Sequence, residues 1–255
     1  MSEISRRRFF VHSAHNTIGV SAGLAALEAN RPTWRGAPAE RRGDLLKVCL
    51  VSGSHGYESD ESLSLLQVCL RELLGAKCSR AFRKAGGELP GLENLDDCDC
   101  MVLFAERMAI GGDPLKRIQH YCRNGGAVVG LRTASCAFQN WRGLDREVFG
   151  GDYQGRYPQG SRPQVEIAEA ARRHPVLKGV EPFPATGSLI RHANVSPDAT
   201  LLLTATIPGH TEPAAWTRLH RGGRVFYTSL GHRNDFGEIG FVRLLINAVL
   251  WTTRR

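Results

Sequence analysis

Histidine, arginine and carboxylate side chains follow separate apolar runs of the sequence, as they do where loops at the ends of strands build a site. His55 and Glu58 come just after the first of these runs. Arg132 follows a later run, and His232 follows the last one. An imidazole exchanges protons near neutral pH, and a guanidinium stays protonated and clamps an anionic or carbonyl oxygen. Together they predict a site that moves protons on a polar, oxygen-rich ligand.

Two further residues suit carbohydrate recognition. Glu212 and Trp216 stand at the start of a strand pattern, and they offer a carboxylate for hydroxyl groups and an indole on which a sugar ring could stack. Each candidate has a plainer alternative: Trp216 fits equally well in the core, and His55 fits equally well on an exposed turn. We therefore expect a binding site assembled from some of these side chains, with the others packed or solvated.

The turn after residues 127–131 has the pattern of a nucleophile elbow, in which a strand leads through a tight turn into a helix. The elbow position holds Arg132, which cannot be a nucleophile because it stays protonated. Cys136 lies one helical turn later and is either a reactive thiol or a packing residue. Asp235 is either an acid that serves His232 or the N-cap of the last helix. No G-x-G-x-x-G fingerprint or P-loop is present.

A metal-dependent hydrolase is a third alternative, after an enzyme without a metal and a non-catalytic binding module. It would use His55, His192 and His232 as ligands. The sequence contains no closely spaced histidine pair of the H-x-x-x-H kind and no matching carboxylate. We therefore assign no metal ligands, and metal analysis of the purified protein would decide this alternative.

Strands that alternate with helices position the candidate residues in the first half of the chain. Alternation of this kind predicts right-handed βαβ units and an open parallel sheet, with ligands bound at the carboxyl ends of the strands. The apolar runs predict strands over 47–53, 76–82, 100–104 and 127–131, and helical spacing predicts helices over 59–74 and 114–123.

The second half reads as a β-rich extension of the same α/β fold. Turn signals rich in proline and glycine separate short apolar runs there, and a long apolar helix closes the chain. We expect strands over 164–168, 187–195, 200–206, 214–219 and 224–229, and a helix over 236–252.

The charge of the chain is concentrated near its start. Residues 1–42 hold seven arginines and three acids, which is half of the formal net charge of +8. The rest has no run of basic residues longer than two, so no basic stripe points to nucleic acid. No apolar stretch reaches eighteen residues, so we expect no transmembrane domain beyond an uncleaved signal segment.

The first 29 residues resemble a bacterial twin-arginine export signal. Ser5-Arg6-Arg7-Arg8-Phe9-Phe10 precedes a modestly apolar segment rich in alanine and glycine. Residues 30–44 are rich in proline, arginine and glycine and predict a linker, so the working domain spans 45–255. We expect a periplasmic or other extracytoplasmic protein, and the alternative is a cytoplasmic protein with a basic tail.

The seven cysteines form no C-x-x-C pair, and an odd number cannot all be paired within one chain. We expect buried free thiols. Reduced cysteines are compatible with twin-arginine export because that route carries folded proteins.

The sequence resembles the ThuA-like (trehalose utilisation) family. The resemblance extends over about 45–253 and is most specific near the C-terminus. It rests on residues 223–232 (GRVFYTSLGH), Asp235-Phe236, residues 244–251 (LLINAVLW), residues 129–133 (VGLRT), residues 174–180 (HPVLKGV), and Glu212-Pro213 with Trp216.

The resemblance implies a flavodoxin-like parallel sheet flanked by helices, as in class I glutamine amidotransferases. Those enzymes use an elbow cysteine and a histidine near the C-terminus. Here Arg132 stands at the elbow, so glutaminase activity is not expected. The family name implies a carbohydrate-like ligand, a disaccharide or keto-sugar, in a site with His55, Arg132 and His232 as catalytic candidates. Glu58, Glu212 and Trp216 are the candidates for substrate binding.

Overall fold

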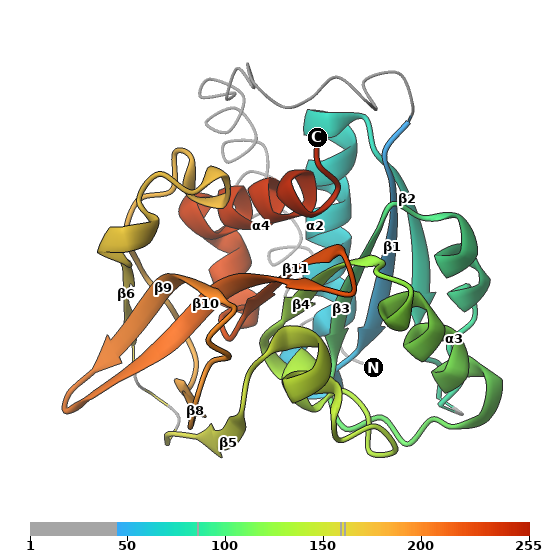
Figure 1. The fold of residues 1–255 in the computed structure, drawn as a ribbon, viewed down its shortest axis with the longest axis horizontal. Helices are drawn as coiled ribbons and strands as arrows, with labels where there is room; N and C mark the ends of the chain where they lie inside the picture. The colour runs from blue at the N-terminus through green and yellow to red at the C-terminus, as the bar shows by residue number, and fades with distance from the viewer. Residues whose placement is uncertain (1–44, 86, 159, 161) are drawn as a thin grey trace, which may run out of the picture.

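The computed structural model describes residues 45–255, except 86, 159 and 161. The expected export signal over 1–29 and linker over 30–44 therefore lie outside the described residues. One nine-stranded sheet organises the chain, with the strand order β2-β1-β3-β4-β11-β10-β9-β6-β7. Figure 1 shows the sheet running between layers of helices. The expected α/β fold with a mostly parallel sheet and a β-rich second half is confirmed.

Five neighbouring strands are parallel, and all but the edge strand β2 are buried along nearly their whole length. Continuous apolar runs of this kind are typical of parallel strands that are covered on both faces. They are β1 (Lys47–Gly53), β2 (Lys77–Phe82), β3 (Cys100–Ala105), β4 (Ala127–Leu131) and β11 (Gly223–Thr228).

The remaining strands extend the sheet in antiparallel fashion, and a separate two-stranded sheet joins β5 to β8. The register between β10 and β9 shifts just after Pro213, as expected because proline lacks the N–H that a ladder needs. The strands are β5 (Tyr153–Arg156), β6 (Gln164–Ile167), β7 (Phe183–Pro184), β8 (Ile190–His192), β9 (Thr200–Ile207) and β10 (His210–His220).

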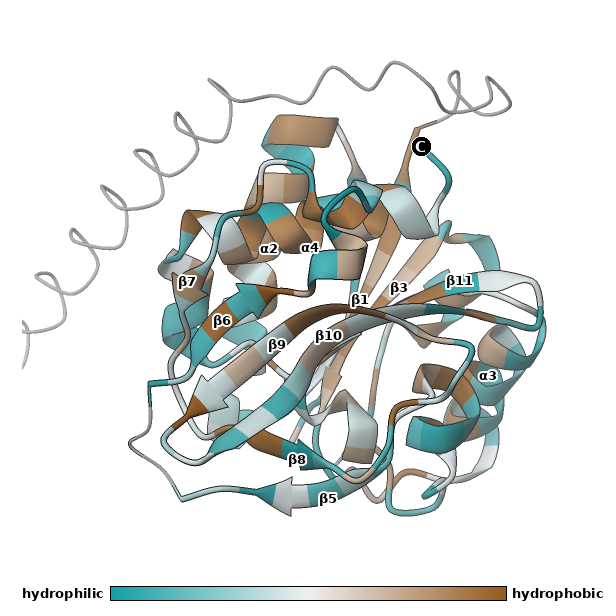
Figure 2. Cartoon of the chain, turned by 60° about the vertical axis from the view of Figure 1, so that its left-hand side comes forward, coloured by the Kyte–Doolittle hydropathy of each residue, from teal (hydrophilic) through white to brown (hydrophobic). Residues whose placement is uncertain are grey.

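Three helices cover the sheet: α2 (Ser59–Leu74), α3 (Gly112–Arg123) and α4 (Ile239–Thr252). Apolar residues of α2 and α4 share one hydrophobic cluster, and those of α3 belong to a second cluster across the sheet. Figure 2 shows the central strands β1 and β3 as largely hydrophobic and the outlying β5 as largely hydrophilic. No helix in the described part of the chain is long and apolar enough to cross a membrane.

Three expected elements differ from the structure by three residues or more. The final helix begins at Ile239 rather than 236, because Arg233–Gly237 forms a 3-10 turn first. Asp235 therefore does not cap α4 and instead accepts hydrogen bonds from the backbone before its own turn. The strand expected over 187–195 is shortened to β8, and the strand expected over 214–219 begins earlier, at His210. Strand β5, which pairs with β8, and strand β7 were not expected.

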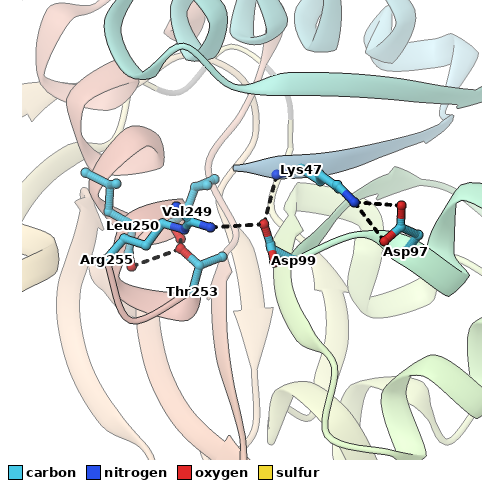
Figure 3. A network of polar contacts seen from close by, with 7 residues as sticks. All are labelled: Lys47, Asp97, Asp99, Val249, Leu250, Thr253 and Arg255. Atoms are coloured by element: carbon cyan, nitrogen blue, oxygen red, sulfur yellow. Dashed lines mark hydrogen bonds and ion pairs between the residues drawn. The ribbon is translucent and has the colours of Figure 1, made fainter. Parts of the chain in front are cut away.

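A polar network ties the end of the chain to the first strand (Figure 3). Asp99 accepts hydrogen bonds from the Lys47 backbone N–H at 2.9 Å and from Arg255 Nη2 at 3.4 Å. The Lys47 ammonium is held by the exposed carboxylate of Asp97 at 2.7 Å. The network therefore fixes the start of β1 beside the C-terminus, at the opposite end of that strand from the loops that carry the candidate residues.

Candidate functional site

Three turns at the carboxyl ends of parallel strands form the candidate site. They are the 3-10 turn His55–Tyr57 after β1, the 3-10 helix Arg132–Cys136 after β4, and the residues that follow β11 up to His232. The carboxyl ends of parallel strands lie on one edge of a sheet, so these turns are neighbours in space. Thr133 Oγ1 joins the first two turns by donating a hydrogen bond to Ser54 Oγ at 3.4 Å.

Arg132 occupies a strained elbow. Its φ of 49° lies in the left-handed region, which costs free energy for a residue with a Cβ. The Tyr227 hydroxyl, which comes from β11, donates a hydrogen bond of 2.6 Å to the Arg132 carbonyl and holds the elbow in place. The side chain is only 1% exposed. The elbow geometry expected after β4 is therefore present, with a cation at the position that a nucleophile occupies in hydrolases.

Neutral groups surround the Arg132 guanidinium. Nη1 donates to the Ser229 carbonyl at 3.3 Å, and Nη2 donates to the carbonyl and hydroxyl of Ser188 at 3.2 and 3.4 Å. The ring of Tyr57 covers the guanidinium at 4.4 Å. No carboxylate among the described residues forms an ion pair with it. The buried cation is therefore held by dipoles and an aromatic face.

His232 lies against the same point as Arg132. A Cβ placed on Gly187 would come within 2.8 Å of Arg132 Nη2 and 3.0 Å of His232 Cδ2. Only glycine permits this close packing, and its φ of 82° also favours glycine. The structure thus brings the two main candidates together against Gly187.

Asp235 orients His232 through Thr186. The Asp235 carboxylate is fully buried and accepts four hydrogen bonds. Oδ2 receives the N–H groups of Gly231 and His232 at 3.0 and 2.9 Å. Oδ1 receives the N–H and the hydroxyl of Thr186, both at 2.7 Å. Thr186 Oγ1 in turn lies 3.1 Å from His232 Nδ1, so the three side chains form a relay.

The relay determines which ring nitrogen of His232 carries the proton. Because Asp235 only accepts, the single Thr186 hydroxyl proton points to Asp235. Thr186 Oγ1 then offers only lone pairs to Nδ1, so Nδ1–H must donate. The Asn234 N–H also approaches Nδ1, but at 3.4 Å, and the shorter contact decides the tautomer. His232 Nε2 is left as a proton acceptor.

His232 is neutral at physiological pH. Burial lowers the pKa of its imidazole, and the positive charge of Arg132 lowers it further. A neutral ring with an accepting Nε2, beside a permanent cation, is suited to act as a general base or as a hydrogen-bond acceptor.

His55 and Glu58 lie at the outer rim. Both are exposed, and Glu58 forms a 2.5 Å ion pair with Arg233, the residue after His232. Glu58 is therefore paired with Arg233 on the surface beside His232. His55 stands on an exposed turn, which is the plainer of its two alternatives.

Glu212 and Trp216 support the fold. Trp216 has no exposed surface, and its Nε1–H donates to the Phe149 carbonyl at 2.7 Å, so it is a core residue and offers no stacking face. Glu212 accepts hydrogen bonds from the Tyr157 hydroxyl at 2.8 Å and from the His192 N–H at 3.1 Å. Its carboxylate already links two segments of the chain.

The three histidines of the metal alternative do not form a cluster. His192 is buried edge-on against the rings of Trp216 and Tyr227. Within the described residues, no group of three or more histidine, cysteine, aspartate or glutamate side chains could hold a metal ion. The geometry gives no support to a metal-dependent hydrolase.

The cysteines are free thiols, and burial suppresses their ionisation. All seven are unpaired, and four are buried. Burial raises the pKa of the Cys136 thiol to about 11, so its thiolate is scarce at neutral pH. Cys136 is consequently a poor nucleophile.

The family model described as "ThuA: Trehalose utilisation" matches residues 47–252, which is most of the chain. The chain belongs to the ThuA family. No curated protein matches it in sequence.

Solved structures of ThuA-like proteins share this fold. One from Parabacteroides merdae ATCC 43184 is 20% identical with a TM-score of 0.66, covering 82% of this chain and 90% of that chain. One from Bacteroides uniformis ATCC 8492 is 18% identical with a TM-score of 0.64, covering 85% and 95%. A Thermoplasma acidophilum protein described as part of a GMP synthase is 15% identical with a TM-score of 0.51, covering 80% and 95%. At these identities the likeness establishes the fold alone.

Three residues of this ThuA-family site were not expected from the sequence. Tyr57 covers Arg132, Ser188 binds it, and Thr186 connects His232 to Asp235. The string Ala185-Thr186-Gly187-Ser188 runs into the strand expected over 187–195, and that expectation assigns no site residue to it. Its one usable signal is a glycine flanked by two hydroxyl residues, which is common in turns.

Substitution of Thr186 tests the relay. Nitrogen-15 NMR of the imidazoles should show His232 as the Nδ1–H tautomer in the wild-type protein. Thr186→Val should move it toward Nε2–H because Nδ1 loses its acceptor, whereas Thr186→Ser should keep the wild-type tautomer. His232→Gln assigns the signal by its disappearance. An Nε2–H ring in the wild-type protein would show that the proposed relay does not exist.

Asp145 gives a pH dependence of stability. Burial raises its pKa to about 7, so the folded state holds its proton more tightly than the unfolded state does. Stability from this group is complete below about pH 4 and is lost as pH rises toward 7. The effect of Asp145→Asn on the free energy of unfolding, relative to the wild type, should therefore be more stabilising at pH 8 than at pH 5 by roughly 2 kcal/mol. Urea unfolding at the two pH values measures this difference. Asp152→Asn, at a partly exposed carboxylate with a lowered pKa, should show no such trend.

Proposed function

We propose that this ThuA-family protein binds or acts on a carbohydrate at the edge of the sheet where Arg132 and His232 converge. Family membership relates the protein to trehalose utilisation. The observation that carries the proposal is that Arg132 and His232 both pack against Gly187, where a Cβ would come within 3.0 Å of each side chain. A cation and a neutral base that meet at one point suit a ligand with oxygen atoms and exchangeable protons.

The roles of the two residues follow from their chemistry. The Arg132 N–H groups hold a ligand oxygen and stabilise charge that develops on it. His232 Nε2 takes a proton from the ligand and returns it. Thr186 and Asp235 keep the ring in the accepting tautomer. The site needs no covalent intermediate for these roles.

Glutamine hydrolysis is outside this proposal. The elbow carries a guanidinium, which has no nucleophilic form in water. Cys136 lies four residues later in a different position, and burial disfavours its thiolate. The amidotransferase-like fold is therefore used here without the amidotransferase nucleophile.

A non-catalytic binding module is the second candidate. The nearly complete burial of Arg132 beneath Tyr57 favours it, because a closed site suits retention of a ligand more than rapid turnover.

A sugar panel with one variant distinguishes the two candidates. Trehalose, other disaccharides and their keto forms are incubated with the protein and followed by proton NMR, and binding is measured by calorimetry. His232→Gln should lower turnover by about a hundredfold or more while leaving the dissociation constant nearly unchanged. His120→Gln, on the exposed part of α3, is the matched control.

The panel has three informative outcomes. Turnover that depends on His232 supports the enzyme. Saturable binding without turnover of any sugar excludes the enzyme hypothesis and supports the non-catalytic binding module. If no sugar is bound or turned over, carbohydrates are excluded as the ligand class.

We also propose that the chain is exported by the twin-arginine route. The motif at Arg6 and Arg7 supports this, and so do the seven free thiols, which fit a protein folded before export. In a bacterial host, the wild-type chain should appear in the periplasmic fraction. Replacing both arginines with lysine should retain it in the cytoplasm, and equal distribution of the two forms would contradict export by this route.

A further inference from the structure

Four arginines from separate segments gather near the amino ends of β4 and β11. Arg254 Nη2 donates a hydrogen bond to the Gly222 carbonyl at 3.0 Å. A Cβ on Gly125 would lie 2.5 Å from the Arg221 carbonyl, so the turn after α3 packs against the turn before β11. These contacts bring together the residues that we call the basic patch: Arg123, Arg221, Arg224 and Arg254.

The charges of the basic patch are not neutralised by the chain that the structure describes. None of the four guanidiniums forms an ion pair with a described carboxylate. Three of them are exposed, and Arg224 is half-buried above the ring of Trp251 at 4.9 Å. Burial lowers the pKa of Arg224, and the positive charge of Arg254 lowers it further. Like charges held this close repel each other, so the patch lacks an anion.

Two of these arginines stand where the backbone favours a different residue. Arg221 and Gly222 form the two-residue turn between β10 and β11, with φ of 52° and 83°. Asparagine followed by glycine is the usual choice for such a turn. Arg254, with a φ of 60°, follows the C-cap of α4, where glycine is usual. Local structure therefore disfavours arginine at both positions, and a role at the surface explains it better.

Exposed apolar side chains border the basic patch. Leu219 and Leu45, at 60% and 54% exposed, are the two most exposed large apolar residues of the described chain. Leu219 stands directly opposite Arg224 in the β10–β11 pair, so both side chains lie on one face of the sheet. Leu45 precedes the Lys47 network that reaches Arg255 (Figure 3). Arginines beside exposed apolar groups are typical of surfaces that rest on lipid headgroups.

The N-terminal segment joins the described chain at this end of the molecule. Residues 1–44 are attached to Leu45, and residues 1–42 hold seven arginines against three acids. Residues 30–44 can span at most about 50 Å when fully extended. If the first 29 residues direct the chain to a membrane, as the proposed export requires, this end is the one held nearest to the lipid.

We propose that the basic patch binds the headgroups of anionic phospholipids, with Leu219 in the headgroup region. The headgroup phosphates supply the missing anions and accept the guanidinium N–H groups. This inference goes beyond the proposed carbohydrate function and concerns the end of the sheet away from His232. The candidate site therefore stays accessible while the chain lies on the membrane.

Vesicle co-sedimentation of the full chain measures the binding. One set of vesicles contains phosphatidylcholine alone, and the other also contains phosphatidylglycerol at about one lipid in three. The wild-type chain should bind the anionic vesicles about tenfold or more tightly than the neutral ones. Added salt should reduce this difference, because salt screens exposed charges.

Two triple variants locate the binding surface. Replacing Arg123, Arg221 and Arg254 with glutamine should weaken binding to the anionic vesicles by about tenfold or more, since each arginine at the lipid surface contributes. The matched control removes the same charge elsewhere and should lose about threefold or less. All substituted side chains are exposed, so the fold should be retained, which circular dichroism checks. The control replaces Arg142, Arg162 and Arg191 with glutamine.

A second pair of variants distinguishes lipid from other polyanions. Leu219→Gln should weaken binding to anionic vesicles by about threefold, because the apolar side chain no longer enters the headgroup region. Ile239→Gln, at an exposed residue at the start of α4, should have no effect. Binding of a single-stranded oligonucleotide, which depends on charge alone, should not respond to Leu219→Gln.

The outcomes separate this inference from the other proposals. Equal loss in the two triple variants, or equal binding to neutral and anionic vesicles, would overturn the basic patch as a lipid site. An oligonucleotide that binds more tightly than the anionic vesicles, and that the patch variant loses, would make nucleic acid the partner instead. Replacing Arg6 and Arg7 with lysine keeps their charge, so it should block export and leave vesicle binding unchanged.

Discussion

The buried carboxylate of Asp235 joins the chain segments on which the site depends. It accepts two N–H groups from the turn after β11 and both donors of Thr186, which comes from a distant part of the chain. These bonds determine where His232 and Gly187 stand relative to each other. Because all four donors are spent on one fully buried carboxylate, neither segment can shift without leaving a buried polar group unsatisfied, which is costly.

Arg132 is the opposite case, since its charge is buried without full compensation. The elbow strain at its φ and the absence of an ion pair between its guanidinium and any described carboxylate both reduce stability. The Tyr227 hydrogen bond and the Tyr57 ring retain the side chain in spite of this. A well-satisfied anion and a poorly satisfied cation thus lie on either side of His232. The first holds the imidazole in orientation, and the second lowers its pKa.

The sequence predicted the framework well for physical reasons that are local. The continuous apolar run of β1 and the glycine that ends α2 at Leu74 depend on neighbouring residues alone, and both elements were placed correctly. Arg132 and His232 could be singled out because Arg132 directly follows one buried parallel strand and His232 lies a few residues after another. The start of α4 was misplaced because Asp235 bonds backward to His232 instead of forward to the helix, a choice that depends on Thr186.

The rest of the site depends on contacts between distant residues, which no local pattern reveals. Trp216 and Glu212 have the residue types of sugar-binding groups, yet their strand turns them toward Phe149 and Tyr157 of the chain itself. Tyr57 and Thr186 have ordinary local surroundings and gain their roles only from what folds against them. The elbow at Arg132 also shows that local sequence and fold determine only part of a site. An amidotransferase-like fold presents whatever residue stands there, so the fold gives the position of the chemistry, while the arginine and its unpaired charge restrict what that chemistry can be.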